Sequence, residues 1–141
     1  MNAPHIDHIG IVVADLDRAI ERLGPLFGGT PVVKELTEVG LRVAEFHAAN
    51  VTVELLQYSG TDDAFARRVM GERLGLNHVS ARVGDLERSL AELRAAGLEP
   101  MEGFPRQGAH GRVAFFEPDA VTGLLFEICQ PDADASPGKG E

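Results

Sequence analysis

Residues 8–23 read HIGIVVADLDRAIERL, and residues 78–93 read HVSARVGDLERSLAEL. At an offset of 70 positions the two stretches share the opening histidine, a valine, an Asp-Leu pair, an arginine and the closing leucine. The same offset aligns the Arg-Val-Ala triplet at 42–44 with the triplet at 112–114. Because these matches occur in one order at one spacing, they indicate that the chain contains two copies of a single module.

The second copy becomes three residues longer after position 116. At the resulting offset of 73, Glu54 in the segment VELL falls opposite Glu127 in the segment FEIC. A duplicated module has equivalent residues at equivalent positions of its copies. Glu54 and Glu127 therefore form one pair, and His8 and His78 form another.

Each copy begins with a strand and continues with a helix. Apolar residues alternate with others over residues 8–13, which is the period of two typical of a strand. Asp15 and Asp85 then occupy the position of a helix N-cap. Apolar residues recur at helical spacing over residues 16–26 and 86–96. The other expected elements are a short helix over 62–72 and strands over 31–35, 40–46, 51–58, 99–103, 112–116 and 124–130.

These elements predict an α+β fold of two tandem β-α-β-β-β modules, in which curled and mostly antiparallel sheets enclose a metal site. We expect one domain over residues 1–130, with repeats at about 5–58 and 76–130 and a linker helix at about 62–73. Residues 131–141 have almost no apolar content, which predicts a disordered tail.

Composition excludes several classes of protein. The chain of 141 residues has a formal net charge of −9, whereas nucleic-acid-binding domains usually carry a basic face. Its one cysteine, Cys129, excludes an intrachain disulfide. We expect no signal peptide, and no stretch approaches the roughly 20 apolar residues that a membrane-spanning helix needs. We therefore expect a cytoplasmic protein with no nucleic-acid or membrane partner.

The two symmetric pairs predict a metal centre. Two imidazoles and two carboxylates suit a divalent ion such as Co²⁺, Mn²⁺, Ni²⁺ or Zn²⁺, and four protein ligands leave two octahedral positions for water or substrate. Taken singly, His8 would be a structural histidine and Glu54 a solvent-facing strand residue. Glu127 lies in the apolar run LLFEIC, where a carboxylate is costly unless it is paired or bound to a metal.

Other polar side chains fit this pattern less well. His5, His47 and His110 have no histidine at the equivalent position of the other copy. Gln57 could be a polar ligand, but it aligns with Gln130 at the end of the strand and not with a carboxylate.

The chain resembles the vicinal oxygen chelate superfamily and, within it, the methylmalonyl-CoA epimerase family. The similarity extends over about residues 5–130. The stretches that carry it are HIDHIGI at 5–11, VELL at 53–56, GLNH at 75–78, PRQGAHGRVAF at 105–115 and GLLFE at 123–127. The stretch at 105–115 points most narrowly to the epimerase family.

The resemblance implies that the four symmetric residues hold the metal. It also implies that Glu38, in a Glu-x-Gly pattern, and Glu127 act as base and acid on opposite faces of the substrate α-carbon. Without the resemblance, Glu38 would be taken for a glutamate of a surface loop. The implied activity is a metal-dependent epimerase that inverts a methylmalonyl-CoA-type thioester through a metal-stabilised enolate. Arg106 and His110 would bind the acyl-CoA substrate, and the protein would be a homodimer.

Two other functions stay open. A glyoxalase I-like lyase, acting on a hemithioacetal, would use the same four ligands without Glu38. A metal-free module that binds a small aromatic molecule would have lost the ligands and gained aromatic residues, whereas this chain has no tryptophan. An extradiol dioxygenase would use two histidines and one carboxylate, and this set has a second glutamate.

The chain departs from the epimerase pattern at Asn77, where that family often has histidine.

Overall fold

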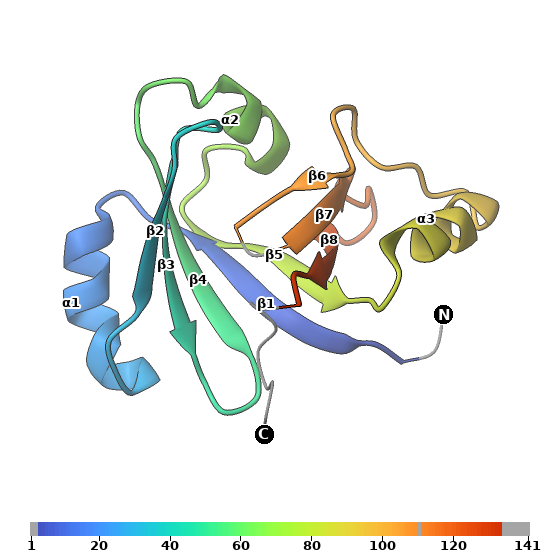
Figure 1. The fold of residues 1–141 in the computed structure, drawn as a ribbon. Helices are drawn as coiled ribbons and strands as arrows, with labels where there is room; N and C mark the ends of the chain where they lie inside the picture. The colour runs from blue at the N-terminus through green and yellow to red at the C-terminus, as the bar shows by residue number, and fades with distance from the viewer. Residues whose placement is uncertain (1–2, 110, 134–141) are drawn as a thin grey trace. The chain divides into compact units, whose positions relative to one another are not determined.

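The computed structural model describes residues 3–109 and 111–133, with the elements drawn in Figure 1. The chain divides into two compact units. We call residues 8–78 the N-terminal unit, and residues 1–7 together with 79–141 the C-terminal unit. The division falls inside two strands, after Asp7 in β1 (His5–Val12) and after His78 in β5 (Gly75–Arg82).

The N-terminal unit has strands in the order β2-β3-β4-β1. Neighbours are antiparallel except for β1 and β4, which are parallel. The predicted elements of this copy are confirmed, with small differences at their ends. Their observed bounds are α1 (Leu16–Phe27), β2 (Val32–Leu36), β3 (Leu41–His47), β4 (Thr52–Tyr58) and α2 (Ala64–Met70).

The C-terminal unit has strands in the order β5-β8-β7-β6. Its elements are α3 (Leu86–Ala95), β6 (Arg106–Gln107), β7 (Gly111–Phe116) and β8 (Leu125–Pro131). The predicted strand over 99–103 is wrong, because this segment makes only an isolated bridge between Pro100 and Phe116. Pro100 has no amide hydrogen and Gly103 has φ +96°, so the segment cannot continue a regular ladder.

Strand pairing confirms the repeat. In the first copy, Glu45 of β3 lies opposite Glu54 of β4. In the second copy, Phe115 of β7 lies opposite Glu127 of β8. The offsets between these pairs are the 70 and 73 positions found in the sequence. Glu54 and Glu127 therefore occupy equivalent places in the two copies.

The two long helices also begin in the same way. Asp15 and Asp85 each accept a hydrogen bond from the amide three residues later, at 3.1 Å. Gln57 and Gln130 accept from the amide of the first residue of α1 and of α3, at 2.6 and 2.8 Å. These bonds satisfy amides that the start of a helix leaves unpaired. Gln57, considered above as a possible ligand, thus has the same capping role as Gln130.

The sheet of the N-terminal unit has two different faces. On one face α1 packs against the strands (Figure 1), in a core of Leu16, Ala44, Phe46, Val53 and Leu55. Neighbouring residues of a strand point to opposite faces, so His8, Glu45 and Glu54 lie on the other, which we call the second face. Towards one end of the strands this second face is apolar, with a cluster of Leu41, Val43, Leu56 and Ala66 of α2.

The core of the C-terminal unit lies beneath α3 and consists of Ala81, Val83, Leu86, Leu90, Ala114, Phe116 and Ile128. The predicted tail falls mostly outside the described residues, although Pro131 still belongs to β8.

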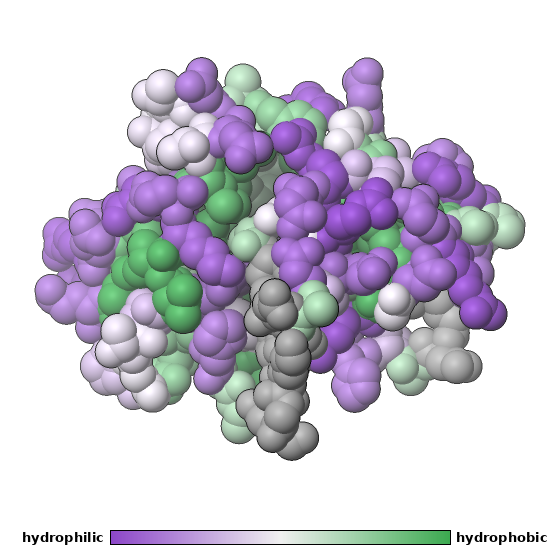
Figure 2. All heavy atoms as spheres, in the orientation of Figure 1, coloured by the Kyte–Doolittle hydropathy of each residue, from purple (hydrophilic) through white to green (hydrophobic). Residues whose placement is uncertain are grey.

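Most of the surface seen in Figure 2 is hydrophilic, with some apolar residues between the hydrophilic ones. In the N-terminal unit the exposed large apolar residues include Leu26, Val32 and Val33. Within residues 3–109 and 111–133, none of the helices has the length and apolar content needed to cross a membrane.

Tyr58, at the end of β4, connects this strand to the end of α2. Its hydroxyl donates a hydrogen bond to the carbonyl oxygen of Gly71. Burial raises the pKa of Tyr58 to about 12, against the opposing effect of the Arg67 charge. Tyrosine in an unfolded chain ionises near pH ~10, so the unfolded state releases the proton first. The contribution of Tyr58 to the free energy of unfolding should therefore be fully present below about pH 10. It should be lost as the pH rises towards about 12.

Tyr58→Phe should lower the free energy of unfolding at neutral pH by about 1 kcal/mol, because the hydrogen bond to Gly71 is lost. The variant should also lose less stability than the wild type above about pH 10. Urea unfolding at neutral and alkaline pH measures both effects. Tyr58 is the one tyrosine of the chain, so ultraviolet absorbance follows its ionisation directly. Ionisation of the folded protein near pH ~10 would contradict the raised pKa.

Candidate metal centre

Two strands bring two histidines together in the N-terminal unit. His8 on β1 is 3% exposed, and His78 on β5 is 4% exposed. Their rings meet edge to face with centroids 5.6 Å apart, and a ring nitrogen of one lies within 4.8 Å of a ring nitrogen of the other. Nitrogen ligands bind zinc-like ions at about 2.0–2.1 Å, so a small movement of either ring would allow both to bind one ion.

Glu54 on β4 is the third buried member of this group, with 5% of its surface exposed. It pairs in register with Gly10, two residues after His8 on the parallel strand β1. Its Oε1 lies 3.7 Å from Nε2 of His8. The fold of the N-terminal unit thus groups three of the four predicted ligands.

Gly10 leaves the space that the His78 ring occupies. A Cβ at this position would lie 2.1 Å from Cε1 and 2.5 Å from Nε2 of His78, which is far shorter than ordinary carbon contacts of about 3.5–4.0 Å. Glycine inside a strand often marks such a close approach. Gly10, inside the first strand, was therefore the signal in the sequence for a side chain packed close to this backbone.

Glu45 is a further buried acid on the second face, and it is 3% exposed. It lies directly opposite Glu54 in the β3–β4 ladder, so the two side chains point to the same face. Its Oε1 lies 3.4 Å from Nζ of Lys34 and 3.8 Å from Nε2 of His47. The equivalent residue of the second copy is Phe115. A carboxylate is therefore present at this position in one copy only.

The remaining predicted residues have different surroundings. Glu38 is exposed on the turn between β2 and β3. Arg106 is half-buried at the start of β6 in the C-terminal unit. His110 lies outside the described residues. Glu127 is 4% exposed on β8, also in the C-terminal unit, at the place equivalent to that of Glu54.

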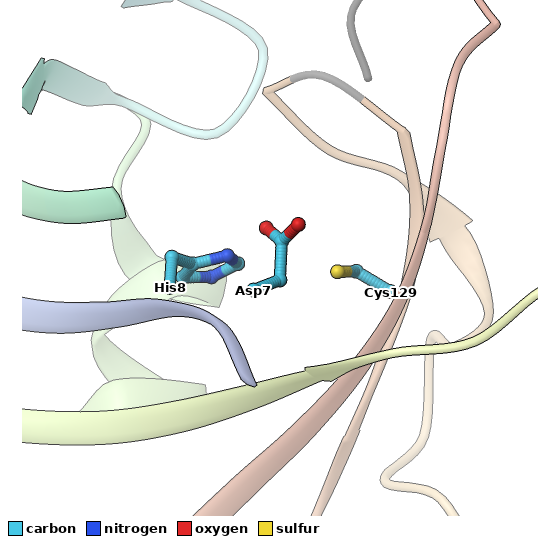
Figure 3. Close-up of side chains that lie close together, drawn as sticks. All are labelled: Asp7, His8 and Cys129. Atoms are coloured by element: carbon cyan, nitrogen blue, oxygen red, sulfur yellow. The ribbon is translucent and has the colours of Figure 1, made fainter. Parts of the chain in front are cut away.

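Asp7 and Cys129 form a second buried group, in the C-terminal unit (Figure 3). A carboxylate oxygen of Asp7 lies within 4.8 Å of the Cys129 sulfur. Oδ1 of Asp7 accepts a hydrogen bond of 3.0 Å from Nε of Arg82, and the Asp7 side chain has no exposed surface. The guanidinium of Arg82 compensates the buried charge of Asp7. This ion pair explains the acid at position 7 without a metal ion.

The donor atoms around His8 suit a divalent ion. Imidazole nitrogen and carboxylate oxygen together are typical ligands of first-row transition metals. Glu54 is buried with its Oε1 3.7 Å from Nε2 of His8, and burial of an ionised carboxylate is costly unless a cation or hydrogen-bond donors compensate it. A metal bound by His8, His78 and Glu54 would supply that compensation.

Known proteins resemble the chain over most of its length. The sequence model of the Glyoxalase/Bleomycin resistance protein/Dioxygenase superfamily matches residues 7–116. The uncharacterized protein YqjC of Bacillus subtilis (strain 168) is 30% identical over 131 residues, which cover 92% of this chain and 94% of that protein. The mitochondrial methylmalonyl-CoA epimerase of Bos taurus is 28% identical over 134 residues, which cover 92% and 75% of the two chains.

Solved structures of methylmalonyl-CoA epimerases are also similar to this chain. A variant of the Streptomyces coelicolor methylmalonyl-CoA epimerase, in complex with 2-nitronate-propionyl-CoA, has a TM-score of 0.78 and 26% identity. The alignment covers 95% of this chain and 99% of that chain. The duplicated β-α-β-β-β module and the family match agree, and the chain belongs to the glyoxalase/bleomycin resistance protein/dioxygenase superfamily, the vicinal oxygen chelate superfamily, with methylmalonyl-CoA epimerases among its homologues.

Proposed function

We propose that this protein is a metal-dependent epimerase that inverts the α-carbon of a methylmalonyl-CoA-type thioester. The observation that carries the proposal is the buried group of His8, His78 and Glu54 in a chain whose homologues include methylmalonyl-CoA epimerases. Glu127 is proposed as the fourth ligand, because it occupies the place of Glu54 in the second copy and is equally buried. The metal would be Co²⁺, Mn²⁺, Ni²⁺ or Zn²⁺.

A bound divalent ion would act as a Lewis acid that favours the enolate form of the thioester. The chain itself must then move the α-proton. Epimerisation requires a base on one face of the carbon and an acid on the other. We assign these roles to Glu38 and Glu127, with Glu45 as the next candidate for the base.

The proposed substrate class is supported by the relatives. The Streptomyces coelicolor homologue was solved with 2-nitronate-propionyl-CoA. Arg106 and His110 are the residues proposed to bind the acyl-CoA substrate here. A guanidinium suits phosphate or carboxylate groups because it can form two parallel hydrogen bonds. The homodimer stays a prediction.

Proton exchange tests the function directly. Methylmalonyl-CoA is incubated with the protein in deuterated water, with added Co²⁺ or with a chelator, and deuterium at the α-carbon is measured by mass spectrometry. We expect exchange with Co²⁺ and none above background with the chelator. Absence of exchange with any malonyl thioester would overturn the proposal, and turnover of a hemithioacetal would then favour the glyoxalase I-like lyase.

A further inference from the structure

Asn77 directly precedes His78 and forms a hydrogen bond on each side of its amide. Its Nδ2 donates to the carbonyl oxygen of Met70 at 2.8 Å, and its Oδ1 lies 2.8 Å from Nδ1 of His78. A backbone carbonyl can only accept, so the amide nitrogen must face Met70 and the amide oxygen must face His78. Since this oxygen also only accepts, Nδ1 of His78 must carry the proton.

An imidazole that donates through Nδ1 has its lone pair on Nε2 when it is neutral. We infer that Asn77 is a positioning residue, which holds His78 in the tautomer and orientation whose Nε2 can bind a metal. Hydrogen bonds of this kind to the second ring nitrogen commonly fix metal-binding histidines. The inference rests on the proposed function for the role of His78 as a ligand, whereas the tautomer itself does not depend on it.

The orientation of the Asn77 amide is set by α2. Met70 is the last residue of that helix, and Gly71 ends it with φ +76°. The last carbonyls of a helix have no partner inside the helix, so Met70 offers an acceptor at a fixed place. Asn77 takes this acceptor with its nitrogen and therefore presents its oxygen to His78.

The two copies of the module treat this position differently. The equivalent of Asn77 is Asp7, 70 residues earlier, and its carboxylate accepts from Arg82. A carboxylate has no N–H and could not donate to Met70 as the Asn77 amide does. The amide at position 77 is thus suited to bridge a carbonyl and a ring N–H, whereas the carboxylate at the equivalent position 7 is not.

Two substitutions distinguish the hydrogen bond that Asn77 accepts from His78 from the one that it donates to Met70. Asn77→Leu has a similar size but removes both hydrogen bonds. Asn77→Asp keeps an oxygen acceptor for His78, but it loses the donor to Met70 and adds a negative charge. Asn50→Leu, on the exposed turn between β3 and β4, is the matched control for an asparagine-to-leucine change away from the site.

The first readout is Co²⁺ affinity, measured by calorimetric titration of the metal-free full chain. Asn77→Leu should bind about 10–100-fold more weakly than the wild type, the range found for outer partners of metal ligands. Asn77→Asp and Asn50→Leu should stay within a few-fold of the wild type. Wild-type affinity in Asn77→Leu would overturn the inference, because an acceptor for Nδ1 of His78 would then be unnecessary.

The second readout is the tautomer of His78 in the metal-free protein, from ¹⁵N NMR of histidine-labelled chain. The resonances of His78 are assigned by their absence in His78→Gln. We expect the Nδ1–H form in the wild type and in Asn77→Asp, and its loss in Asn77→Leu. An Nε2–H form in the wild type would overturn the inference. If the wild type binds no Co²⁺, the proposed function fails, while these spectra still test the role of Asn77.

Discussion

Glu38→Gln is expected to slow exchange of the substrate α-proton by about 10²–10⁴-fold, the usual range for loss of a general acid or base. Its Co²⁺ content should equal that of the wild type, because Glu38 is proposed as a base and not as a ligand. Glutamine has nearly the same size and cannot accept the proton. Glu127→Gln should lower both quantities, because Glu127 is proposed for both tasks. Deuterium uptake and metal analysis of the same preparations measure the two effects separately.

Glu45→Gln is the informative comparison. Glu38 is exposed on a turn, whereas Glu45 is buried on the second face directly opposite Glu54. If Glu38→Gln keeps the full rate and Glu45→Gln loses it, the base is Glu45. Glu21→Gln, at an exposed position of α1, is the matched control and should change neither rate nor metal content.

Gly10→Ala is expected to disrupt the metal centre although Gly10 offers no ligand. The new methyl group would lie 2.1 Å from the His78 ring. This ring is buried, and its Nδ1 is hydrogen-bonded to the side chain of Asn77. Either the ring moves or the strands separate. Forcing an extra group into a packed interior costs about 1–3 kcal/mol. Since the displaced residue is a proposed ligand, Co²⁺ affinity should fall by at least the roughly 10–100-fold typical of outer partners.

Gly84→Ala is the control for this change. A Cβ at Gly84 would meet nothing within 4 Å, and the first copy already has Ala14 at the equivalent position. This variant should bind Co²⁺ like the wild type and unfold at the same urea concentration. Wild-type affinity and stability in Gly10→Ala would show that His78 is not held where the structure has it.

Much of the fold could be predicted because the two copies have local patterns with a short period. Alternation with a period of two and apolar spacing with a period of 3.6 identified the strands and helices of the first copy. The strand predicted over 99–103 was wrong because Pro100 and Gly103 prevent a regular ladder, although the segment looks like a strand in the sequence. Whether such a segment pairs depends on the backbone groups that it can offer to its neighbour.

By itself, the sequence determined the duplication, the symmetric pairs of histidines and glutamates, and the resemblance to the superfamily that the family match confirms. Only the tertiary structure decided that Gly10 makes room for His78, that Asn77 bridges His78 and Met70, and that Glu45 is buried opposite Glu54. A local pattern determines which face of a strand a side chain takes. The residue it meets there depends on the register and order of strands distant in the chain, and no pattern within one strand contains that information.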